Sequence, residues 1–366
     1  MNLAALLFDV ARRLPERPAV SDERHSWTYR EFAARVARLA GGLRAKGLAP
    51  GDRVLLSLEN CGEFFELLFG CWAAGLCAVP SNARLHPREV EYLAENARAR
   101  LLVATPGLAD ALAPLARAVD TLDAVIATGT ADYDALLAAD PLDPQPGSPE
   151  DHAWLFYTSG TTGRPKGAVL SHRNLLFMSQ CYYADIDRVD ERDTHLLAAP
   201  VSHGAGLYAL AFVLKGAHQV VLPHFAVADI LDVIGRHPRV SLFAAPTMLT
   251  RLAHAPEVAS ADLAHLKTIY YGGGPMYVAD LEKALGLFGP RLYQLYGQGE
   301  SPMTITGLDQ RRHAESGHPR WRERLGSCGV PRTGVLVRVV DEDDTELPPG
   351  AIGEVVTKSD CVMQGY

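Results

Sequence analysis

The feature that most constrains the fold is an alternation of amphipathic helical patterns with short apolar strands along most of the 366 residues. Thr28 and Glu31 have the spacing of a capping box, and the helix expected after them ends near Gly47. A second helix is expected over residues 63–74. Strands are expected at residues 53–58, 101–104, 194–198, 219–222, 241–244, 268–271, 291–295, 336–340 and 352–357. This alternation predicts an α/β fold whose layered sheets are largely parallel.

A proline-rich segment, DPLDPQPGSPE at residues 140–150, interrupts the alternation and is typical of a linker or a surface loop. We therefore expect two similar layered α/β subdomains, over residues 1–150 and 151–310, with the glycine-rich loop described below in the second. The charged segment 309–324 is expected to be irregular. Residues 325–366 are expected to form a partial, small β subdomain, inside which the sequence stops.

Composition narrows the functional class. The hydrophobic fraction of 48% allows a sizeable core, and the net charge of −8 argues against a nucleic-acid partner. The six cysteines are widely spaced and form no CxxC pair, which is typical of reduced thiols in a reducing compartment. No signal peptide or membrane span is expected. These features predict a soluble, cytoplasmic protein, and they leave its oligomeric state open.

The stretch YTSGTTGRPKG, at residues 157–167, lies between two apolar runs. Glycines allow a tight turn in which successive backbone N–H groups point into one concavity, and such a concavity suits phosphate oxygens. Ser159, Thr161 and Thr162 add hydroxyl donors, and Lys166 adds a positive charge. The stretch therefore predicts a polyphosphate-binding loop.

A stretch of this composition also has two other interpretations. A Walker P-loop requires Gly-Lys-Ser/Thr at the start of a helix. Here Pro165 precedes Lys166, Gly167 follows it, and the next residues read as a strand, so the Walker interpretation fails. A plain Gly/Thr hairpin is the structural alternative. Eleven consecutive positions that fit one binding pattern favour the phosphate interpretation.

YTSGTTGRPKG resembles the phosphate-binding signature of the adenylate-forming (AMP-binding) superfamily, which includes acyl-CoA synthetases, luciferases and peptide-synthetase adenylation domains. Further segments resemble motifs of that superfamily in the expected order: PVSHGAGL (200–207), PTML (246–249), GGGPM (272–276), YGQGE (296–300), residues 326–331 and residues 350–366. On these motifs the chain is identified as a member of the acyl-CoA synthetase or fatty-acid–CoA ligase type, N-terminal portion only.

The resemblance implies a two-step reaction. A small carboxylate attacks the α-phosphorus of ATP and gives an acyl-adenylate and pyrophosphate. The thiol of CoA then attacks the acyl carbon and releases AMP. Charge develops on phosphoryl oxygens in the first step, so fixed donors and Mg²⁺ are expected to stabilise it. Amino-acid activators usually carry an aspartate near the position of Ser202 and His203, and its absence favours a simple carboxylic acid.

The resemblance also implies roles for particular residues. Those expected to bind the nucleotide are Ser159, Gly160, Thr161, Thr162, Gly163, Lys166, Gly273, Gly274, Pro275, Tyr296, Gly297, Gln298 and Gly299. Those expected to be catalytic are Thr161, Lys166, His203 and Glu300. Glu300 is also the expected metal ligand, because Mg²⁺ prefers hard oxygen donors. Those expected to bind the acyl group are His203, Gly204, Thr247, Tyr271, Gln298 and Met303.

The sequence departs from the family pattern in two places. Gly299 stands where the family usually has a threonine that helps to hold the α-phosphate, so that donor would have to come from elsewhere, for example from Ser301. The family's ribose-binding aspartate, hinge and mobile C-terminal domain with its adenylation lysine would lie beyond Tyr366. The resemblance thus implies a truncated chain that binds nucleotide weakly and forms adenylate very poorly.

Several alternatives stay open at this stage. Within the family, the chain could be an adenylation domain that loads a carrier protein, or a luciferase. In a different class, it could be a non-catalytic module that binds a nucleotide or an acyl group. A purely structural α/β protein ranks last, because it would leave the polar loop around Thr161 without a purpose.

Overall fold

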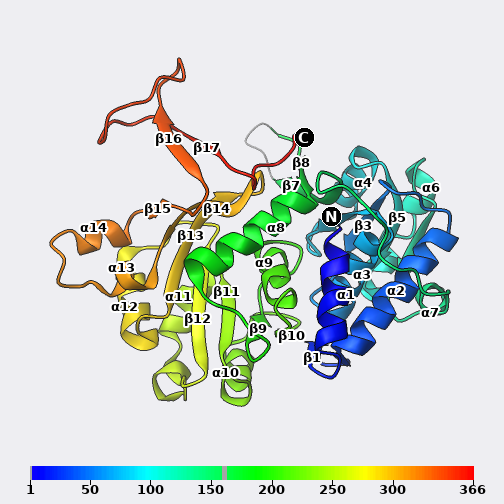
Figure 1. The fold of residues 1–366 in the computed structure, drawn as a ribbon, viewed down its shortest axis with the longest axis horizontal. Coiled ribbons are helices and arrows are strands. Elements are labelled where there is room, and N and C mark those ends of the chain that lie inside the picture. The colour runs from blue at the N-terminus through cyan, green and yellow to red at the C-terminus, as the bar shows by residue number, and fades with distance from the viewer. Residues whose placement is uncertain (1, 159–162) are drawn as a thin grey trace.

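The computed structural model describes residues 2–158 and 163–366, and these form two open α/β sheets and a separate hairpin (Figure 1). The six-stranded sheet contains β3 (Arg53–Ser57), β4 (Cys77–Ser81), β5 (Ala99–Ala104), β6 (Ala124–Ala127), β7 (His152–Thr158) and β8 (Lys166–Ser171). Its strand order is β6-β5-β3-β4-β7-β8. All its pairs are parallel except the edge pair β7–β8.

The second sheet has nine strands in the order β15-β14-β13-β12-β11-β9-β10-β1-β2. They are β1 (Pro18–Ser21), β2 (Ser26–Thr28), β9 (Thr194–Leu197), β10 (His218–Val221), β11 (Val240–Ala244), β12 (Leu266–Gly272), β13 (Leu292–Gln298), β14 (Ser301–Leu308) and β15 (Val330–Pro331). Its central strands are parallel, and antiparallel pairs close both edges. The predicted α/β class with largely parallel sheets is therefore confirmed.

Helices cover both sheets. They are α1 (Leu3–Arg13), α2 (Tyr29–Ala45), α3 (Gly62–Ala73), α4 (Pro87–Asn96), α5 (Pro106–Leu112), α6 (Leu115–Ala118), α7 (Ala131–Leu137), α8 (His172–Cys181), α9 (Gly204–Val213), α10 (Val227–Arg236), α11 (Pro246–His254), α12 (Val278–Phe288), α13 (Gln310–Ala314) and α14 (Trp321–Leu325). The capping box predicted at the start of α2 is confirmed, because Thr28 and Glu31 bond reciprocally. None of the described helices is both long enough and apolar enough to cross a lipid bilayer.

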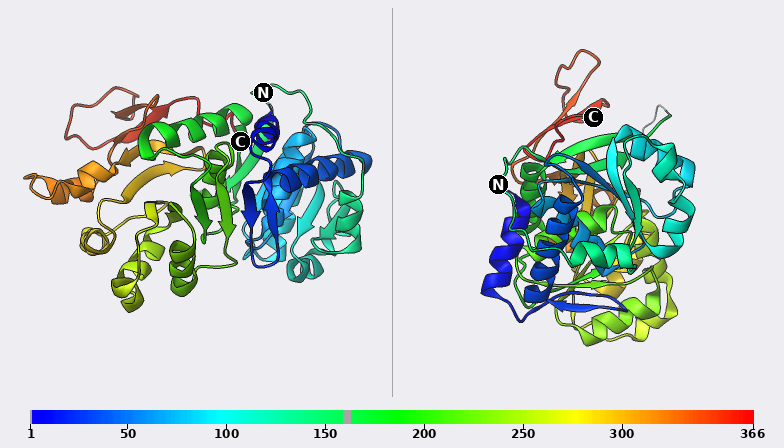
Figure 2. Two further views of the ribbon diagram at one scale, coloured as in Figure 1. Left: turned by 60° about the horizontal axis from the view of Figure 1, so that its bottom comes forward. Right: turned by 90° about the vertical axis from the view of Figure 1, so that its right-hand side faces the viewer.

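Three hydrophobic clusters hold these layers together. The largest lies between the two sheets and combines α1, α2 and α3 with α8 and α9 (Figure 2). Phe64 and Phe65 of α3 and Tyr208 and Phe212 of α9 are buried within it. The other two clusters lie on the outer faces, under α4 and α5 on the first sheet and under α10, α11 and α12 on the second.

Two predictions about organisation were wrong. The sheets do not divide the chain at residue 150: β1 and β2 belong to the nine-stranded sheet, while β7 and β8 belong to the six-stranded one. The glycine-rich hairpin therefore extends the first sheet, because β7 pairs with β4 at Trp154 and Ala78. The segment 309–324 is not wholly irregular but contains α13 and most of α14, since Asp309 caps α13 by accepting from the Arg312 backbone N–H.

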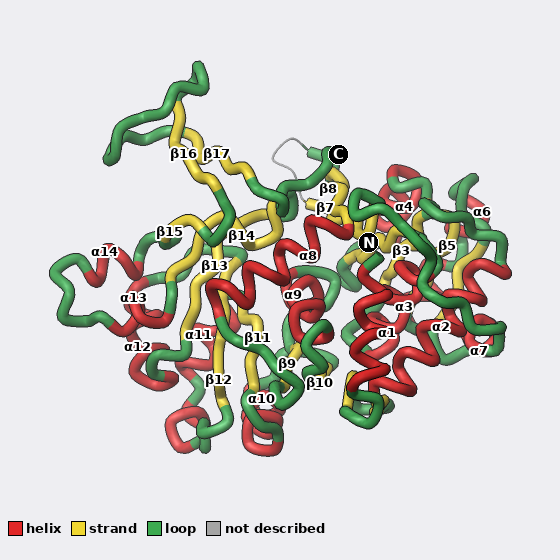
Figure 3. The backbone as a smooth tube through the Cα atoms, viewed as in Figure 1, coloured by secondary structure: helices red, strands yellow, loops and turns green. Residues whose placement is uncertain are grey.

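Two other segments agree with expectation. Residues 140–148 contain no helix or strand and run as a loop beside α2 and α3 (Figure 3). The last two strands, β16 (Leu336–Val340) and β17 (Glu354–Lys358), pair as an antiparallel hairpin that projects from the body (Figure 1). After β17 the chain returns to the body and ends beside β8.

Candidate active site

The described ends of the glycine-rich stretch lie on the antiparallel β7–β8 hairpin, in which Thr158 pairs with Lys166 and Tyr157 with Gly167. This is the predicted strand–loop–strand context, and no helix begins at Lys166, so the motif is not a Walker loop. Lys166 is exposed at the start of β8. Of the predicted phosphate-binding residues, Ser159, Gly160, Thr161 and Thr162 lie outside the described part of the chain.

The hairpin is fixed to α4 from both of its strands. The Tyr157 hydroxyl donates to Asn96 Oδ1 at 2.6 Å, and the Tyr92 hydroxyl donates to the Pro165 carbonyl at 3.0 Å. The Arg164 guanidinium lies over the Tyr92 ring, 5.4 Å from its centroid. Next to it Gly163 has a φ of +116°, a conformation that L side chains rarely adopt. The base of the loop is therefore held in place on both sides.

Glu300 lies in the turn between β13 and β14 of the other sheet, and it reaches the hairpin. The Thr158 hydroxyl donates to Glu300 Oε1 at 3.1 Å. Thr158 is also the register partner of Lys166, so the turn that carries Glu300 and the strand that carries Lys166 meet at one place. Carboxylate and hydroxyl oxygens are hard donors of the kind that Mg²⁺ prefers, so these residues fit such an ion.

Gly299, the position that departs from the family pattern, is packed against β7. A Cβ atom there would lie 2.5 Å from Phe156 Cδ1 and 2.5 Å from Thr158 Cγ2, far inside van der Waals contact. The two sheets therefore approach each other too closely at this position to leave room for a threonine side chain. Ser301, the suggested replacement donor, is buried with its hydroxyl 3.4 Å from Thr304 Oγ1, so the structure gives it no exposed donor.

A second group of the residues predicted to bind the nucleotide lies at the carboxyl ends of two neighbouring parallel strands, β12 and β13. Tyr296 is 39% exposed although it belongs to a strand, and Gln298 is exposed beside it. The stretch Gly273–Pro275 is exposed after β12, and Gly273 has a φ of +86°. An exposed aromatic ring next to an open glycine backbone can accept a flat heterocycle.

His203 is the N-cap residue of α9 and lies against the hairpin strand. Its ring packs edge to face on Phe156 with centroids 5.7 Å apart, and Nδ1 lies 2.8 Å from the Ser202 hydroxyl. Burial lowers the pKa of His203, so the imidazole is neutral near pH 7. A neutral imidazole can accept a proton from an incoming thiol.

Met303 is held in an unusual backbone conformation beside His203. Its φ is +51°, and its carbonyl accepts hydrogen bonds from the Tyr208 hydroxyl at 3.1 Å and from Arg332 Nη1 at 3.2 Å. A Cβ at Gly204 would lie 2.0 Å from Met303 Cε, and one at Gly297 would lie 2.5 Å from Met303 Cα. The two glycines thus leave room for Met303, and strained residues of this kind concentrate at functional sites.

The structure does not bring all the predicted acyl-binding residues together. Tyr271 is buried on the outer face of β12, and its hydroxyl lies 2.9 Å from His313 Nε2. Its neighbour Tyr270 faces the central core, where it packs against Phe243 and Tyr208. Successive side chains of a strand point to opposite faces of the sheet. Tyr271 therefore lies on the face of β12 opposite to Tyr270, away from Met303. Thr247 is exposed in the first turn of α11.

A cavity of about 650 Å³ adjoins Ser202, at the carboxyl ends of parallel strands from both sheets. No sequence motif pointed to its polar lining, which includes Asn60, Arg84, His224 and Arg251. Asn60 Nδ2 donates to the carbonyls of Ala199 and Leu222, both at 3.0 Å, and so ties the two sheets together at this point. The rule that ligands of open α/β sheets bind beyond the carboxyl ends of the strands would have pointed to these positions.

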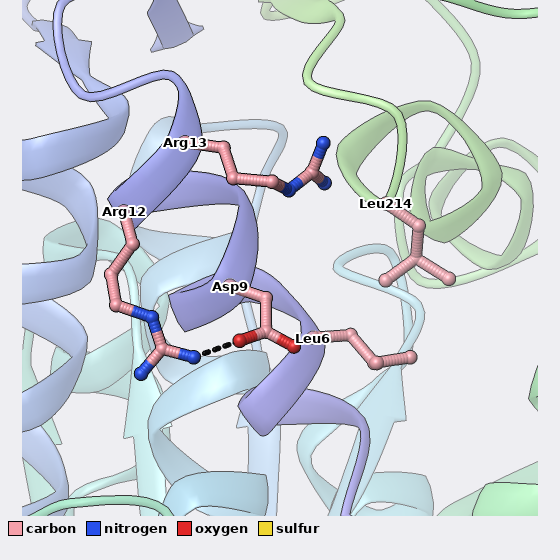
Figure 4. A pocket seen from close by; sticks show the side chains of 5 residues that line it. All are labelled: Leu6, Asp9, Arg12, Arg13 and Leu214. Carbon is pink, nitrogen blue, oxygen red and sulfur yellow. Dashed lines mark hydrogen bonds and ion pairs between the residues drawn. The ribbon is translucent and has the colours of Figure 1, made fainter.

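A further polar cluster and a small surface groove lie elsewhere among the described residues. Asp22, His25 and Glu63 lie within possible metal-ligating distance, but Glu63 is bound by Arg24 at 2.9 and 3.0 Å. Asp22 already accepts backbone N–H groups, including that of Gly62 at 2.7 Å. A surface groove of about 310 Å³ beside α1, lined by Leu6, Asp9, Arg12, Arg13 and Leu214, contains none of the predicted site residues (Figure 4).

Comparison with known proteins gives one consistent result. The family model of the AMP-binding enzymes matches residues 7–366. Feruloyl-CoA synthase from Amycolatopsis sp is 36% identical over 359 residues, which cover 97% of this chain and 70% of that protein. The fatty acid–[acyl-carrier-protein] ligase ScoC from Streptomyces coeruleorubidus is 32% identical over 364 residues, which cover 97% of this chain and 68% of that protein.

Solved structures agree with the sequence comparison. The inhibitor-bound N-terminal domain of FACL13 from Mycobacterium tuberculosis has a TM-score of 0.87 and 27% identity, and the match covers 99% of this chain and 90% of that one. ATP-bound MatB from Rhodopseudomonas palustris has a TM-score of 0.87 and 29% identity, and the match covers 100% of this chain and 71% of that one.

Proposed function

The chain belongs to the AMP-binding enzyme family, and we propose that it takes part in the ATP-dependent activation of a small carboxylic acid and its transfer to a thiol. Relatives named as acyl-CoA and acyl-carrier-protein ligases support this acid–thiol ligase class. More specifically, we propose that it is an acyl-CoA synthetase that uses ATP, Mg²⁺ and CoA. We expect it to act inside the cell.

One observation carries the proposal. Thr158, in the strand that leads into the glycine-rich loop, donates to Glu300 Oε1, and its register partner is Lys166. A carboxylate from one sheet and a lysine from the other are thereby brought to the same loop. Hard oxygens for a divalent cation and a positive charge for phosphate oxygens are the two elements that polyphosphate binding needs.

In the proposed reaction, Lys166 and the loop bind the β- and γ-phosphates, and Tyr296 stacks on adenine. Bound at Glu300, Mg²⁺ would neutralise charge on the phosphates. Because Gly299 has no side chain, the β13–β14 turn can approach β7 closely, which sets the distance between Glu300 and the hairpin. No residue here has to donate a proton in the first step, because a carboxylate is already the nucleophile.

For the second step, we propose that the thiol enters through the 650 Å³ cavity that reaches Ser202. The neutral His203 lies next to this residue, with Nδ1 within hydrogen-bonding distance of the Ser202 hydroxyl. Its packing on Phe156 keeps the imidazole between the cavity and the phosphate hairpin. His203 is therefore suited to accept the thiol proton as the acyl carbon is attacked.

The acid is expected to be a fatty or an aryl acid. Met303 occupies the space beside Gly204 and limits the depth available to an acyl chain on that side. The 32% identical fatty acid–[acyl-carrier-protein] ligase supports a second candidate acceptor besides CoA, a carrier-protein thiol. If CoA is the acceptor, the cavity should bind the nucleotide part of CoA. If a carrier protein is the acceptor, no such binding is needed.

Calorimetric titration with ATP, with and without Mg²⁺, tests the proposal. We expect binding that Mg²⁺ strengthens, and we expect Lys166→Ala and Glu300→Gln each to weaken it about tenfold or more, as loss of a charge-assisted contact does. AMP formation with a panel of fatty and aryl acids, offered CoA or a carrier protein, then identifies the acid and the acceptor. Unchanged ATP affinity in both variants would rule out the proposed site.

A further inference from the structure

The last residues of the chain form a strap that joins the two halves of the candidate site. The Gln364 N–H donates to the Val169 carbonyl, and the Val169 N–H donates to the Gly365 carbonyl, both at 2.9 Å, so this segment pairs with β8. The Met363 N–H donates to the Glu300 carbonyl at 2.8 Å. The strap, residues 359–366, therefore touches both the phosphate hairpin and the turn that carries Glu300.

Tyr366, at the end of the strap, contacts both charged residues of the proposed site. Its hydroxyl donates to Glu300 Oε1 at 2.8 Å, and Lys166 Nζ lies 5.0 Å from the centroid of its ring. The side chain is largely exposed, with 64% of the residue accessible. Because this side chain is exposed, filling the core does not explain its position. Its contacts with Glu300 and Lys166 are therefore the interactions of interest.

We propose that Tyr366 is a positioning residue for the metal–nucleotide complex, which orients Glu300 through its hydroxyl and steadies Lys166 through its ring. The inference rests on the proposed function of this site. It assigns a role to a residue that the motif analysis of the loop and of Glu300 did not include.

The geometry of the carboxylate gives the physical reason. Thr158 and Tyr366 both donate to Oε1, and among the described residues Oε2 accepts no hydrogen bond. A glutamate side chain that is otherwise free loses rotamer entropy when it binds a metal. Two hydroxyl donors on one oxygen hold the side chain in place beforehand and leave the other oxygen for a cation.

Replacing Tyr366 by phenylalanine tests this inference, because Tyr366→Phe removes the hydroxyl but keeps the ring over Lys166. The backbone bonds of the strap do not involve the hydroxyl, so the fold should be unaffected. We measure the dissociation constant of ATP with Mg²⁺ and with EDTA. Loss of one hydrogen bond to a charged group should weaken Mg²⁺–ATP binding about five- to tenfold and leave Mg²⁺-free binding unchanged.

A merely structural role would lower both affinities together, so the ratio of the two is the decisive readout. Tyr183→Phe is the matched control, since it removes a hydroxyl that bonds the Ala211 carbonyl, away from Glu300. In the background of Glu300→Gln, the change at Tyr366 should have less than half of its effect, because the two residues share one interaction. All proteins in this experiment carry a Gly-Ser extension after Tyr366. The extension prevents a terminal carboxylate on Tyr366 from interacting with Lys166.

An unchanged Mg²⁺ ratio in Tyr366→Phe would overturn the inference, and so would tighter Mg²⁺–ATP binding, which would mark Tyr366 as a residue that blocks Glu300. In both of these cases the wild-type chain still binds ATP in a Mg²⁺-dependent manner, and the proposed function stands. Absence of any Mg²⁺-dependent ATP binding by the wild-type chain would overturn both.

Discussion

Restoring the family's threonine at position 299 should damage this protein rather than improve it. A Cβ at Gly299 would lie 2.5 Å from atoms of both Phe156 and Thr158. Neither side chain can move without consequence, because Phe156 packs on His203 and Thr158 donates to Glu300. Inserting atoms into a close-packed contact typically costs about 1–3 kcal/mol. We therefore expect Gly299→Thr to lower the free energy of unfolding by that amount.

Urea unfolding followed by tryptophan fluorescence measures this loss. Gly286→Thr is the matched control, because a Cβ at that helical position meets no atom within 4 Å, and it should change stability by less than about 0.5 kcal/mol. Phe156→Ala makes room for the new side chain. Combined with Gly299→Thr, it should therefore show a coupling energy of about 1 kcal/mol or more.

The same variant separates two explanations of the glycine. If Gly299 is needed only because the two sheets approach closely there, Gly299→Thr should bind Mg²⁺–ATP more weakly. The added side chain would then push Thr158 away from Glu300. A Gly299→Thr chain that is as stable as the wild type and binds Mg²⁺–ATP more tightly would refute the packing argument. It would show that the site merely lacks a threonine donor.

Three further predictions follow from the structure. Gly204→Ala should displace the flexible end of the Met303 side chain and alter the acid-length preference in the AMP-formation assay, with a loss of less than about 1 kcal/mol in stability. Arg332→Ala should cost about 3–5 kcal/mol in urea unfolding, since it leaves Asp185 without its buried ion-pair partner at 2.8 Å. Stability should fall as pH falls from about 6.5 towards 4, by on the order of 2 kcal/mol per buried histidine at pH 5. Burial lowers the histidine pKa to about 4 at His172, His218 and His313 and to about 3 at His195, so the unfolded chain binds more protons in this window.

Local patterns predicted much of this fold because they act over a few residues. The capping box at Thr28, the strand before the glycine-rich loop and the strand after it all depend on neighbouring side chains. The partner of a strand in a sheet depends on the whole chain. The sequence therefore did not reveal that β1 joins β10 from the far half, or that the hairpin extends the first sheet.

The candidate site shows the same division. Motifs identified Lys166, His203 and Glu300, and the structure brings the β7–β8 hairpin, Phe156 and the Glu300 turn together. The motifs did not reveal that Tyr271 lies away from Met303, because neighbouring residues of a strand point to opposite faces of the sheet. Nor did they identify Asn60 or Tyr366, whose contacts join segments that are distant in sequence.

A crystal structure of the chain with ATP and Mg²⁺ tests the central claim most directly. We predict the triphosphate at the β7–β8 hairpin near Lys166, adenine against Tyr296, and the cation bound by Glu300 through the oxygen that Thr158 and Tyr366 leave free. A nucleotide bound away from the hairpin, with Glu300 turned away from the cation, would contradict the account.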